Sequence, residues 1–397
     1  MSRIIRSFIV AALLGPLTVQ AQTPPAESAP AAPAPVLGSD PGKGPPWYSA
    51  VTFSGMIDAY YMIRFDAAQD APIRARVFDP AIDPNSGAPN GGAGFNLGYA
   101  KLSAFMAPSP VGFRLDLGFG PAANVLSPDL GLTRDINNPA KYVQQAYAAM
   151  QLGPVELDVG RFATSAGAEV IEAKDNWLYS RSLLFGLVPF THVGAKASAT
   201  VLPGLTATLG VNNGWDVLVG GAAGRTAQVS LAWAGPRATT LAANLYVGEN
   251  PFLWSGATNT GGSIRTLVDA VAATTYGPFS FNVNFDWATE AGNDWWGISG
   301  MVRYALPGDF LRVTGRGEFV KDYHGARFFT PAGAQVGLDT EVFEFTGGLS
   351  VPVGSHAELR LEGRYDHADN DAIFVGSKNL EPKKDQATGT LAALVWF

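Results

Sequence analysis

The charged residues of one segment, residues 164–189, have the types and spacing for electrostatic control of a solute rather than for bond making. Glu169, Glu172, Asp175 and Arg181 occur close together within it. Charges in a narrow, partly dehydrated passage are weakly screened, so they can orient dipolar solutes and sort ions by sign. We therefore expect these four side chains to form the constriction of a pore.

The same segment differs in composition from an exposed loop. Few Gly or Pro residues interrupt its middle, and it offers four apolar anchors: Trp177, Leu178, Leu184 and Phe185. Side chains of this kind are usually buried. We expect the loop to fold inward, with its carboxylates opposite basic residues such as Arg114, Arg312 or Arg316. A loop folded over the rim for stability alone is the alternative.

Patterns for catalysis or metal binding are scarce. The chain has no cysteine, no GxSxG pattern and no HExxH pattern. Its histidines, His192, His324, His356 and His367, are not spaced as a metal-ligand pair. A catalytic His192 with a serine partner in a lipid-cleaving barrel is one interpretation. A wall histidine bonded to the packed loop is the favoured one, so we expect no enzyme activity, no metal and no cofactor.

A period of two residues positions the charged side chains. In residues 356–366 one face carries Ala357, Leu359, Leu361, Gly363 and Tyr365, and the other carries Glu358, Arg360, Glu362, Arg364 and Asp366. Helical spacing would mix these two sets, whereas a strand separates them completely. The segment is therefore expected to be a strand with one apolar and one charged face.

The same pattern predicts about sixteen strands, long enough to cross a bilayer when tilted. They are expected near 52–65, 96–107, 111–120, 141–151, 155–163, 190–201, 205–214, 225–234, 238–248, 264–276, 279–288, 295–305, 309–322, 340–351, 356–367 and 387–397. Short Pro/Gly turns alternate with longer polar segments between them. The fold class is all-β: a transmembrane antiparallel barrel with short periplasmic turns, long external loops and an inward-folded third loop. A soluble β-sandwich is the alternative, but it could not bury so many apolar strand faces.

A barrel of about sixteen strands encloses an aqueous channel. Charged residues on its inner face would be costly on the lipid side. The predicted pore wall contains Arg114, Asp116, Glu156, Asp158, Arg312, Arg316, Glu358, Arg360, Glu362 and Arg364. The signs are nearly balanced, so most of these side chains are expected to pair across strands.

The N-terminus has the features of an export signal. Residues 1–21 combine Arg3 and Arg6, an apolar stretch too short to span a bilayer, and a small-residue cleavage site ending at Ala21. Residues 22–46 are rich in Pro and Ala and predict a disordered periplasmic linker. The barrel domain is expected to occupy residues 47–397.

Composition narrows the class further. The 397 residues carry a net charge of −7, which argues against a nucleic-acid binder, and hydrophobic residues reach 47% without long apolar runs beyond the N-terminus. The acidic balance and the acidic loop favour a mild preference for cations. The last strand ends in Phe397, which we expect to act as the signal for the outer-membrane assembly machinery.

Several strings resemble one family. They are SGMIDAYY from Ser54, VQQAY from Val143, DVGRF from Asp158, GAEVIE from Gly167, DNWLYSRSLLFG from Asp175, PFTHVGAK from Pro189 and LGVNNGWD from Leu209. In these strings the chain is similar to the OmpL-like β-barrel porin family. The resemblance implies an outer-membrane porin and specifies no solute.

The expected function is passive diffusion of small hydrophilic solutes or ions through the outer membrane of a Gram-negative cell. A structural or adhesive barrel is the alternative, and a barrel lipid hydrolase is a weaker one. The expected partners are outer-membrane lipid, lipopolysaccharide, the assembly machinery and the solutes, with a homotrimer as a further possibility and no nucleic acid.

Overall fold

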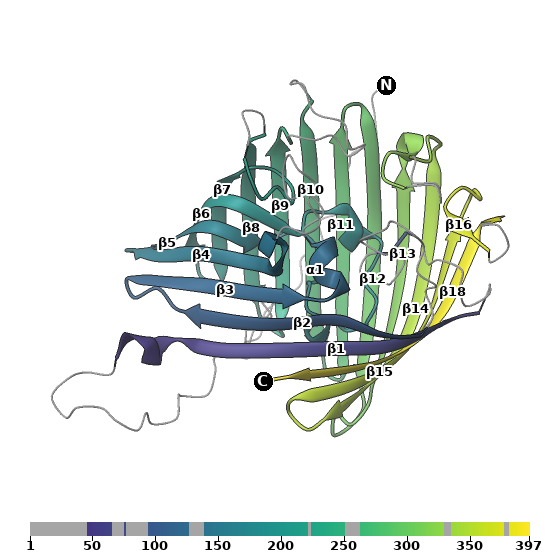
Figure 1. Cartoon of the computed structure of the whole chain (residues 1–397), viewed down its shortest axis with the longest axis horizontal. Coiled ribbons are helices and arrows are strands. Elements are labelled where there is room, and N and C mark those ends of the chain that lie inside the picture. Colours follow the sequence, from purple (N-terminus) through teal and green to yellow (C-terminus); the bar gives the residue numbers. More distant parts are fainter. Residues whose placement is uncertain are drawn as a thin grey trace.

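A computed structural model describes residues 46–65, 75–76, 94–126, 139–220, 224–250, 263–328, 335–376 and 381–397. Within these residues sixteen antiparallel strands close into one barrel, in the order β1-β18-β15-β14-β13-β12-β11-β10-β9-β8-β7-β6-β5-β4-β3-β2 (Figure 1). The predicted fold class is confirmed. The signal peptide at 1–21 and all of the 22–46 linker except Pro46 lie outside the described residues.

All sixteen predicted strands are present, with ends displaced by a few residues at most. They are β1 (Thr52–Arg64), β2 (Gly94–Met106), β3 (Val111–Phe119), β4 (Val143–Leu152), β5 (Val155–Ala163), β6 (Thr191–Leu202), β7 (Leu205–Asn212), β8 (Thr226–Gly235), β9 (Thr239–Gly248), β10 (Arg265–Tyr276), β11 (Phe279–Glu290), β12 (Asn293–Ala305), β13 (Arg312–Asp322), β14 (Thr340–Val353), β15 (Ala357–Ala368) and β18 (Asp385–Trp396). Short turns alternate with longer loops around the ring, except between β11 and β12, which a tight turn joins at their external ends.

The loops contain small elements that the sequence pattern did not reveal. These are α1 (Pro121–Val125), the hairpin of β16 (Phe374–Val375) and β17 (Pro382–Lys383), and the 3-10 turns η1 (Trp47–Ala50), η2 (Pro139–Tyr142), η3 (Ala173–Asp175), η4 (Leu184–Leu187) and η5 (Tyr323–Gly325). Each is too short to show a periodic signal. Helix α1 lies inside the ring of strands in Figure 1 and packs against β2 and β3.

Alternation along β15 separates lipid from lumen. Leu359 and Leu361 are 47% and 54% exposed on the outer face, whereas Arg360 and Glu362 are 3% and 4% exposed on the inner face. A sheet with its apolar side outward and its charges inward suits a lipid-facing barrel. No helix within the described residues is long and apolar enough to span a membrane.

The barrel closes between the first and last strands. Met56 pairs with Trp396 in the antiparallel register of β1 and β18. Beyond the last strand residue, the Phe397 amide donates to Gly55 O at 3.0 Å, and the Gly55 amide donates to Phe397 O at 3.1 Å. The terminal residue therefore continues the hydrogen bonding that seals the barrel.

Candidate functional site

The third external loop, residues 164–190 between β5 and β6 (L3), follows the inner wall as soon as it leaves β5. Ser165 Oγ donates to Asn244 Oδ1 at 2.8 Å, and the Gly167 amide donates to Asp269 Oδ2 at 3.1 Å. These wall residues lie on β9 and β10. The predicted inward fold of the third loop is therefore confirmed.

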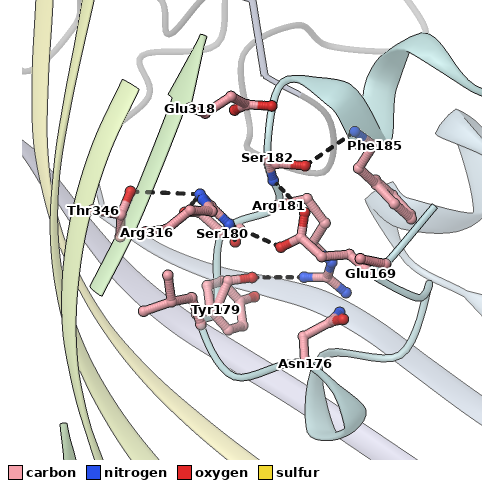
Figure 2. Close-up of polar contacts among 12 residues, drawn as sticks. Glu169, Asn176, Tyr179, Ser180, Arg181, Ser182, Phe185, Arg316, Glu318 and Thr346 are labelled. Atoms are coloured by element: carbon pink, nitrogen blue, oxygen red, sulfur yellow. Dashed lines mark hydrogen bonds and ion pairs between the residues drawn. The ribbon is translucent and has the colours of Figure 1, made fainter. Parts of the chain in front are cut away.

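A buried ion pair fixes the middle of L3 to β13 (Figure 2). Arg316 Nη1 donates to Glu169 Oε1 at 2.8 Å and to the carbonyl of Ser180 at 2.8 Å. Arg316 Nε donates to Glu344 Oε2 on β14 at 3.0 Å. One wall arginine therefore holds two separate parts of L3, at Glu169 and at Ser180, and a neighbouring barrel strand. Arg316 was among the bases expected opposite a loop carboxylate.

Wall carboxylates accept the free amides of L3. Glu362 accepts from the amides of Tyr179 and Ser180, at 2.9 and 3.1 Å. Glu318 accepts hydrogen bonds from the amide of Leu183 at 2.6 Å and from the amide of Leu184 at 2.7 Å. Because a buried amide without an acceptor is costly, these carboxylates fix the path of an irregular loop inside the barrel.

Wall arginines satisfy the carbonyls of the same loop. Arg360 Nη1 donates to Ala173 O at 2.8 Å and to Leu178 O at 3.1 Å. Arg364 Nη1 donates to Arg181 O at 2.5 Å. Several charges assigned to the pore wall thus face the main chain of L3 instead of open water.

The tip of L3 reaches the opposite side of the barrel at β2. Glu172 forms an ion pair with Lys101, and Lys101 Nζ also lies 2.9 Å from Asp116 Oδ2. Burial raises the pKa of Glu172, but the Lys101 ammonium outweighs it and holds the pKa below its ordinary value. Arg114, one of the three bases expected opposite the loop, pairs with Asp116 at 3.0 Å and lines the same cavity as Glu172.

Arg312, another of these three bases, forms ion pairs outside L3. It pairs with Asp309 of the short periplasmic turn and with Glu358 of β15, at 3.0 Å in the second case. Glu358 also pairs with Arg360 at 2.5 Å. The carboxylates of Asp309 and Glu358 therefore compensate the charge of Arg312.

Asp175 and Arg181 have different environments. Asp175 pairs with the adjacent Lys174 at 2.9 Å, and both side chains are about one-quarter exposed, at 24% and 21%. Burial raises the pKa of Asp175 despite the Lys174 ammonium. Arg181 is buried and donates to the carbonyls of Tyr179 and Ile171. Asp175 therefore faces the lumen, whereas Arg181 braces the loop.

Three of the four expected anchors of L3 are buried. Leu178, Leu184 and Phe185 are 2%, 0% and 5% exposed. Trp177 is only partly buried and lines a cavity. The remaining loop end is held by Asp216, whose Oδ1 accepts the amides of Phe190 and Thr191. Burial raises the pKa of Asp216 to about 6, although these amides and two arginines oppose the shift.

Apolar clusters fill the barrel around and above L3. The largest joins L3 to the external ends of β9–β15 and contains Ala166, Leu183, Leu184, Leu187, Val188, Trp215, Tyr246, Leu267, Ala288, Trp295, Val320, Phe328, Val342, Ala368, Ile373 and Phe374. A second cluster joins L3 to α1 and β2, and a third joins it to β1 and β18. The outer half of the barrel is consequently closely packed among the described residues.

A cavity of about 610 Å³ lies on the periplasmic side of L3. Its charged lining consists of Lys101, Arg114, Glu169, Glu172, Lys174, Asp175 and Lys196. Strands β7–β11 contribute small or neutral side chains, such as Thr206, Thr208, Ala242, Ala273 and Asn282. The predicted constriction residues Glu169, Glu172 and Asp175 therefore meet at one cavity, and Arg181 does not line it.

The remaining wall residues form local pairs. Asp158 on β5 lies 3.5 Å from Lys196 on β6, and Lys196 is 4.8 Å from the centre of the Phe162 ring. Glu156 is the next inward position of β5 toward the periplasm and is partly exposed. Sequence reasoning did not identify Lys101 or Lys196 as constriction residues. Both lie on the inward faces of their strands, and only the path of L3 through the barrel determines which inward residues line the cavity beside it.

His192 is a buried wall residue joined to the base of L3. Its Nδ1 is 3.0 Å from Gly214 O and its Nε2 is 3.4 Å from Thr164 Oγ1, while its ring stacks on Tyr246. Within the described residues no group of three or more His, Cys, Asp or Glu side chains is arranged to hold a metal ion.

Comparison with known proteins agrees with this architecture. The family model described as "Putative beta-barrel porin-2, OmpL-like" matches residues 50–397. No curated protein matches the sequence. Among solved structures, the trimer form of OmpT, an outer membrane protein of Vibrio cholerae, is 12% identical, with TM-score 0.54 over 87% of this chain and 99% of that one. The outer membrane channel DcaP of Acinetobacter baumannii is 13% identical, with TM-score 0.53 over 87% and 97%. The anion-selective porin from Comamonas acidovorans is 11% identical, with TM-score 0.52 over 87% and 99%.

Proposed function

The chain belongs to the OmpL-like β-barrel porin family, and from this we propose that it conducts small hydrophilic solutes or ions across the outer membrane by passive diffusion past L3. The proposal is carried by one observation: a cavity of about 610 Å³ inside the barrel, roofed by the charged tip of L3. A cavity of this size accommodates a small solute.

The packed outer half of the barrel restricts this channel. Inward side chains near the external ends, such as Met62, Leu267 and Val342, are fully buried. Among the described residues, this packing narrows the route from the cavity to the external side. We therefore propose a narrow channel with low conductance and discrete gating steps, governed by the contacts of L3.

Reconstitution in a planar bilayer tests the function. The full chain should give stepwise currents, and replacing residues 167–175 with a Gly-Ser segment of equal length should enlarge the steps, because it removes the Glu169 and Glu172 attachments. Bilayers that stay silent for both proteins, with heat-modifiable barrel present, would overturn the channel and favour the structural or adhesive role. Hydrolysis of an ester substrate by a silent barrel would favour the hydrolase.

Export and assembly belong to the same proposal. We propose cleavage after Ala21, insertion by the outer-membrane assembly machinery, and contact with lipid and lipopolysaccharide. A homotrimer is supported by the trimer form of the OmpT relative and by the small outward residues Ala195, Ala197 and Ala199 on β6. N-terminal sequencing and cross-linking in native membranes test these points: an N-terminus other than residue 22, or monomer alone, would contradict them.

A further inference from the structure

Arg303 differs from the other inward arginines of the periplasmic half of the barrel. It lies near the periplasmic end of β12, is partly exposed, and follows Met301, which lines the cavity. Its Nε is buried and has no hydrogen-bond partner among the described residues. No ion pair to Arg303 occurs within that part of the chain either. A guanidinium group that lies next to the cavity lining, with an unbonded Nε and no ion pair, retains its binding capacity for a solute.

The neighbouring charges are already paired with one another. Arg312 and Arg360 interact electrostatically with Arg303, and so do Glu358 and Asp309. Both carboxylates are occupied: Asp309 by Arg312, and Glu358 by Arg312 and Arg360. Among these five groups, three guanidinium groups face two carboxylates, and neither carboxylate forms an ion pair with Arg303 in the described part of the chain.

An aromatic ring lies beside this charge. The centre of the Trp177 ring is 5.8 Å from the Arg303 guanidinium carbon. Trp177 belongs to the tip of L3 and faces the same cavity. A guanidinium group next to an exposed indole can bind a planar anion, because the fork of N–H donors matches two oxygens while the ring contacts an apolar body.

Four bases and three carboxylates line the cavity, and each of these carboxylates is already paired with a base. Lys196 is 23% exposed and its nearest carboxylate, Asp158, is 7% exposed at 3.5 Å. Glu169 lines the cavity but is compensated by Arg316, which is fully buried. Glu156 opposes this excess at the neighbouring inward position. The lining from β7–β11 is neutral, so no carboxylate on that side offsets the bases.

We propose that Arg303 and Trp177 form an oxyanion-binding site in the periplasmic vestibule, and that the solutes of this channel are small anions bearing a carboxylate or a phosphate. The assignment deepens the proposed function and rests on it for the transport step, but binding to the site is independent of conduction. It reverses the cation preference expected from the net charge, because exposure within the lumen, and not total charge, sets the local potential.

Two kinds of measurement on the full chain test the site. In planar bilayers with a potassium chloride gradient, the wild type should favour chloride, and sodium benzoate or sodium phosphate added on the periplasmic side should block the current. Isothermal titration of the detergent-solubilised barrel with the same two salts measures binding without conduction. Arg303→Gln should weaken binding of both salts about tenfold, as expected for loss of one charge-assisted contact.

Further variants distinguish binding of a carboxylate with an aromatic ring from binding of phosphate. Trp177→Leu should weaken benzoate and leave phosphate unchanged, because only benzoate has a ring to stack. Arg303→Lys should keep the chloride preference and lose part of the benzoate affinity. The matched control is Arg237→Gln, which removes an exposed arginine 5.7 Å from the Tyr276 ring on the same side of the membrane.

The outcomes are distinguishable. Currents that favour potassium, or benzoate and phosphate binding equal in wild type and a heat-modifiable Arg303→Gln barrel, would overturn the site while leaving the channel intact. A silent barrel that binds both salts through Arg303 would overturn the transport function and support the site. Equal losses in Arg237→Gln and Arg303→Gln would show a general charge effect and refute the assignment.

Discussion

Arg316 Nη1 donates to Glu169 Oε1 at 2.8 Å, joining two side chains that are 147 positions apart in the chain and at most 4% exposed. The pair connects L3 to β13 in a dehydrated part of the barrel. Removing one partner of such a pair leaves a buried charge and typically costs about 3–5 kcal/mol. The attachment of L3 therefore depends strongly on this contact.

Glu169→Gln tests the attachment. The variant should lower the temperature at which the folded barrel is lost on a heat-modifiability gel, and single-channel currents should become noisier as L3 loosens. The control is Glu341→Gln, which breaks the more exposed pair of Lys321 and Glu341 on the barrel exterior and should leave both readouts unchanged. A Glu169→Gln barrel as stable and as quiet as the wild type would contradict the role of the pair.

A glycine on β14 makes room for the same loop. A Cβ at Gly348 would lie 2.6 Å from Leu178 Cδ2, whereas the adjacent Gly347 has no neighbour within 4 Å. Gly348→Val should therefore displace L3 and increase conductance, and Gly347→Val should not. The double variant Gly348→Val/Leu178→Ala should return conductance toward the wild type, because the removed side chain vacates the space. No recovery in the double variant would mean that the effect of Gly348→Val does not act through Leu178.

The barrel could be predicted closely, whereas the partners of its charges could not. Alternation in segments such as residues 356–366 depends only on which face meets lipid, so β15 was evident from the sequence. The partner of Glu172 is Lys101, which depends on where a loop with no repeating pattern ends in three dimensions. The alternation of β12 places Arg303 on the inward face, but its lack of an ion pair among the described residues follows from how Glu358 and Asp309 are shared among its neighbours.

Asp216 predicts a pH dependence of the loop attachment. Burial raises its pKa from 3.8 to about 6, so the folded state binds the proton more tightly than the unfolded state. Stability from this group is therefore greatest below about pH 4, where the carboxyl is protonated, and falls by about 3 kcal/mol in total as the pH rises from about 4 to about 6.

Asp216→Asn keeps an acceptor for the Phe190 and Thr191 amides and removes the titration. The variant should resist thermal unfolding better than the wild type at pH 7.5, and the difference should vanish at pH 4. Asp294→Asn, at the second residue of β12 next to the tight turn after β11, serves as the control. A wild-type advantage at pH 7.5 would show that the Asp216 charge stabilises its arginine neighbours more than burial penalises it.

The terminal aromatic predicts an assembly defect. Phe397 is 68% exposed, and its ring lies against Gly55, where an added Cβ would be 2.6 Å from Cε1 of the ring. Phe397→Ala keeps the main-chain hydrogen bonds to Gly55. A smaller amount of folded barrel in the outer membrane would therefore be caused by loss of the ring. We expect lower yield and more periplasmic degradation, with synthesis unchanged. Phe345→Ala removes a lipid-facing ring of similar exposure, 61%, within β14 and should assemble normally. Equal yields for the wild type and both variants would show that the terminal ring is dispensable.

Glu172 predicts the direction in which the constriction controls ions. Its carboxylate compensates Lys101, which lines the cavity and otherwise pairs only with Asp116 among the described carboxylates. Glu172→Gln should expose more of the Lys101 charge and raise the chloride-to-potassium permeability ratio about twofold, a small change because water in the cavity screens the charge. Lys101→Gln in the same chain should reverse it. Because the pKa of Glu172 lies below its ordinary value, the carboxylate stays ionised at pH 5, so acidification to pH 5 should not reproduce the variant. A reversal potential unchanged by Glu172→Gln, in a channel that still conducts, would mean that ions do not pass the tip of L3.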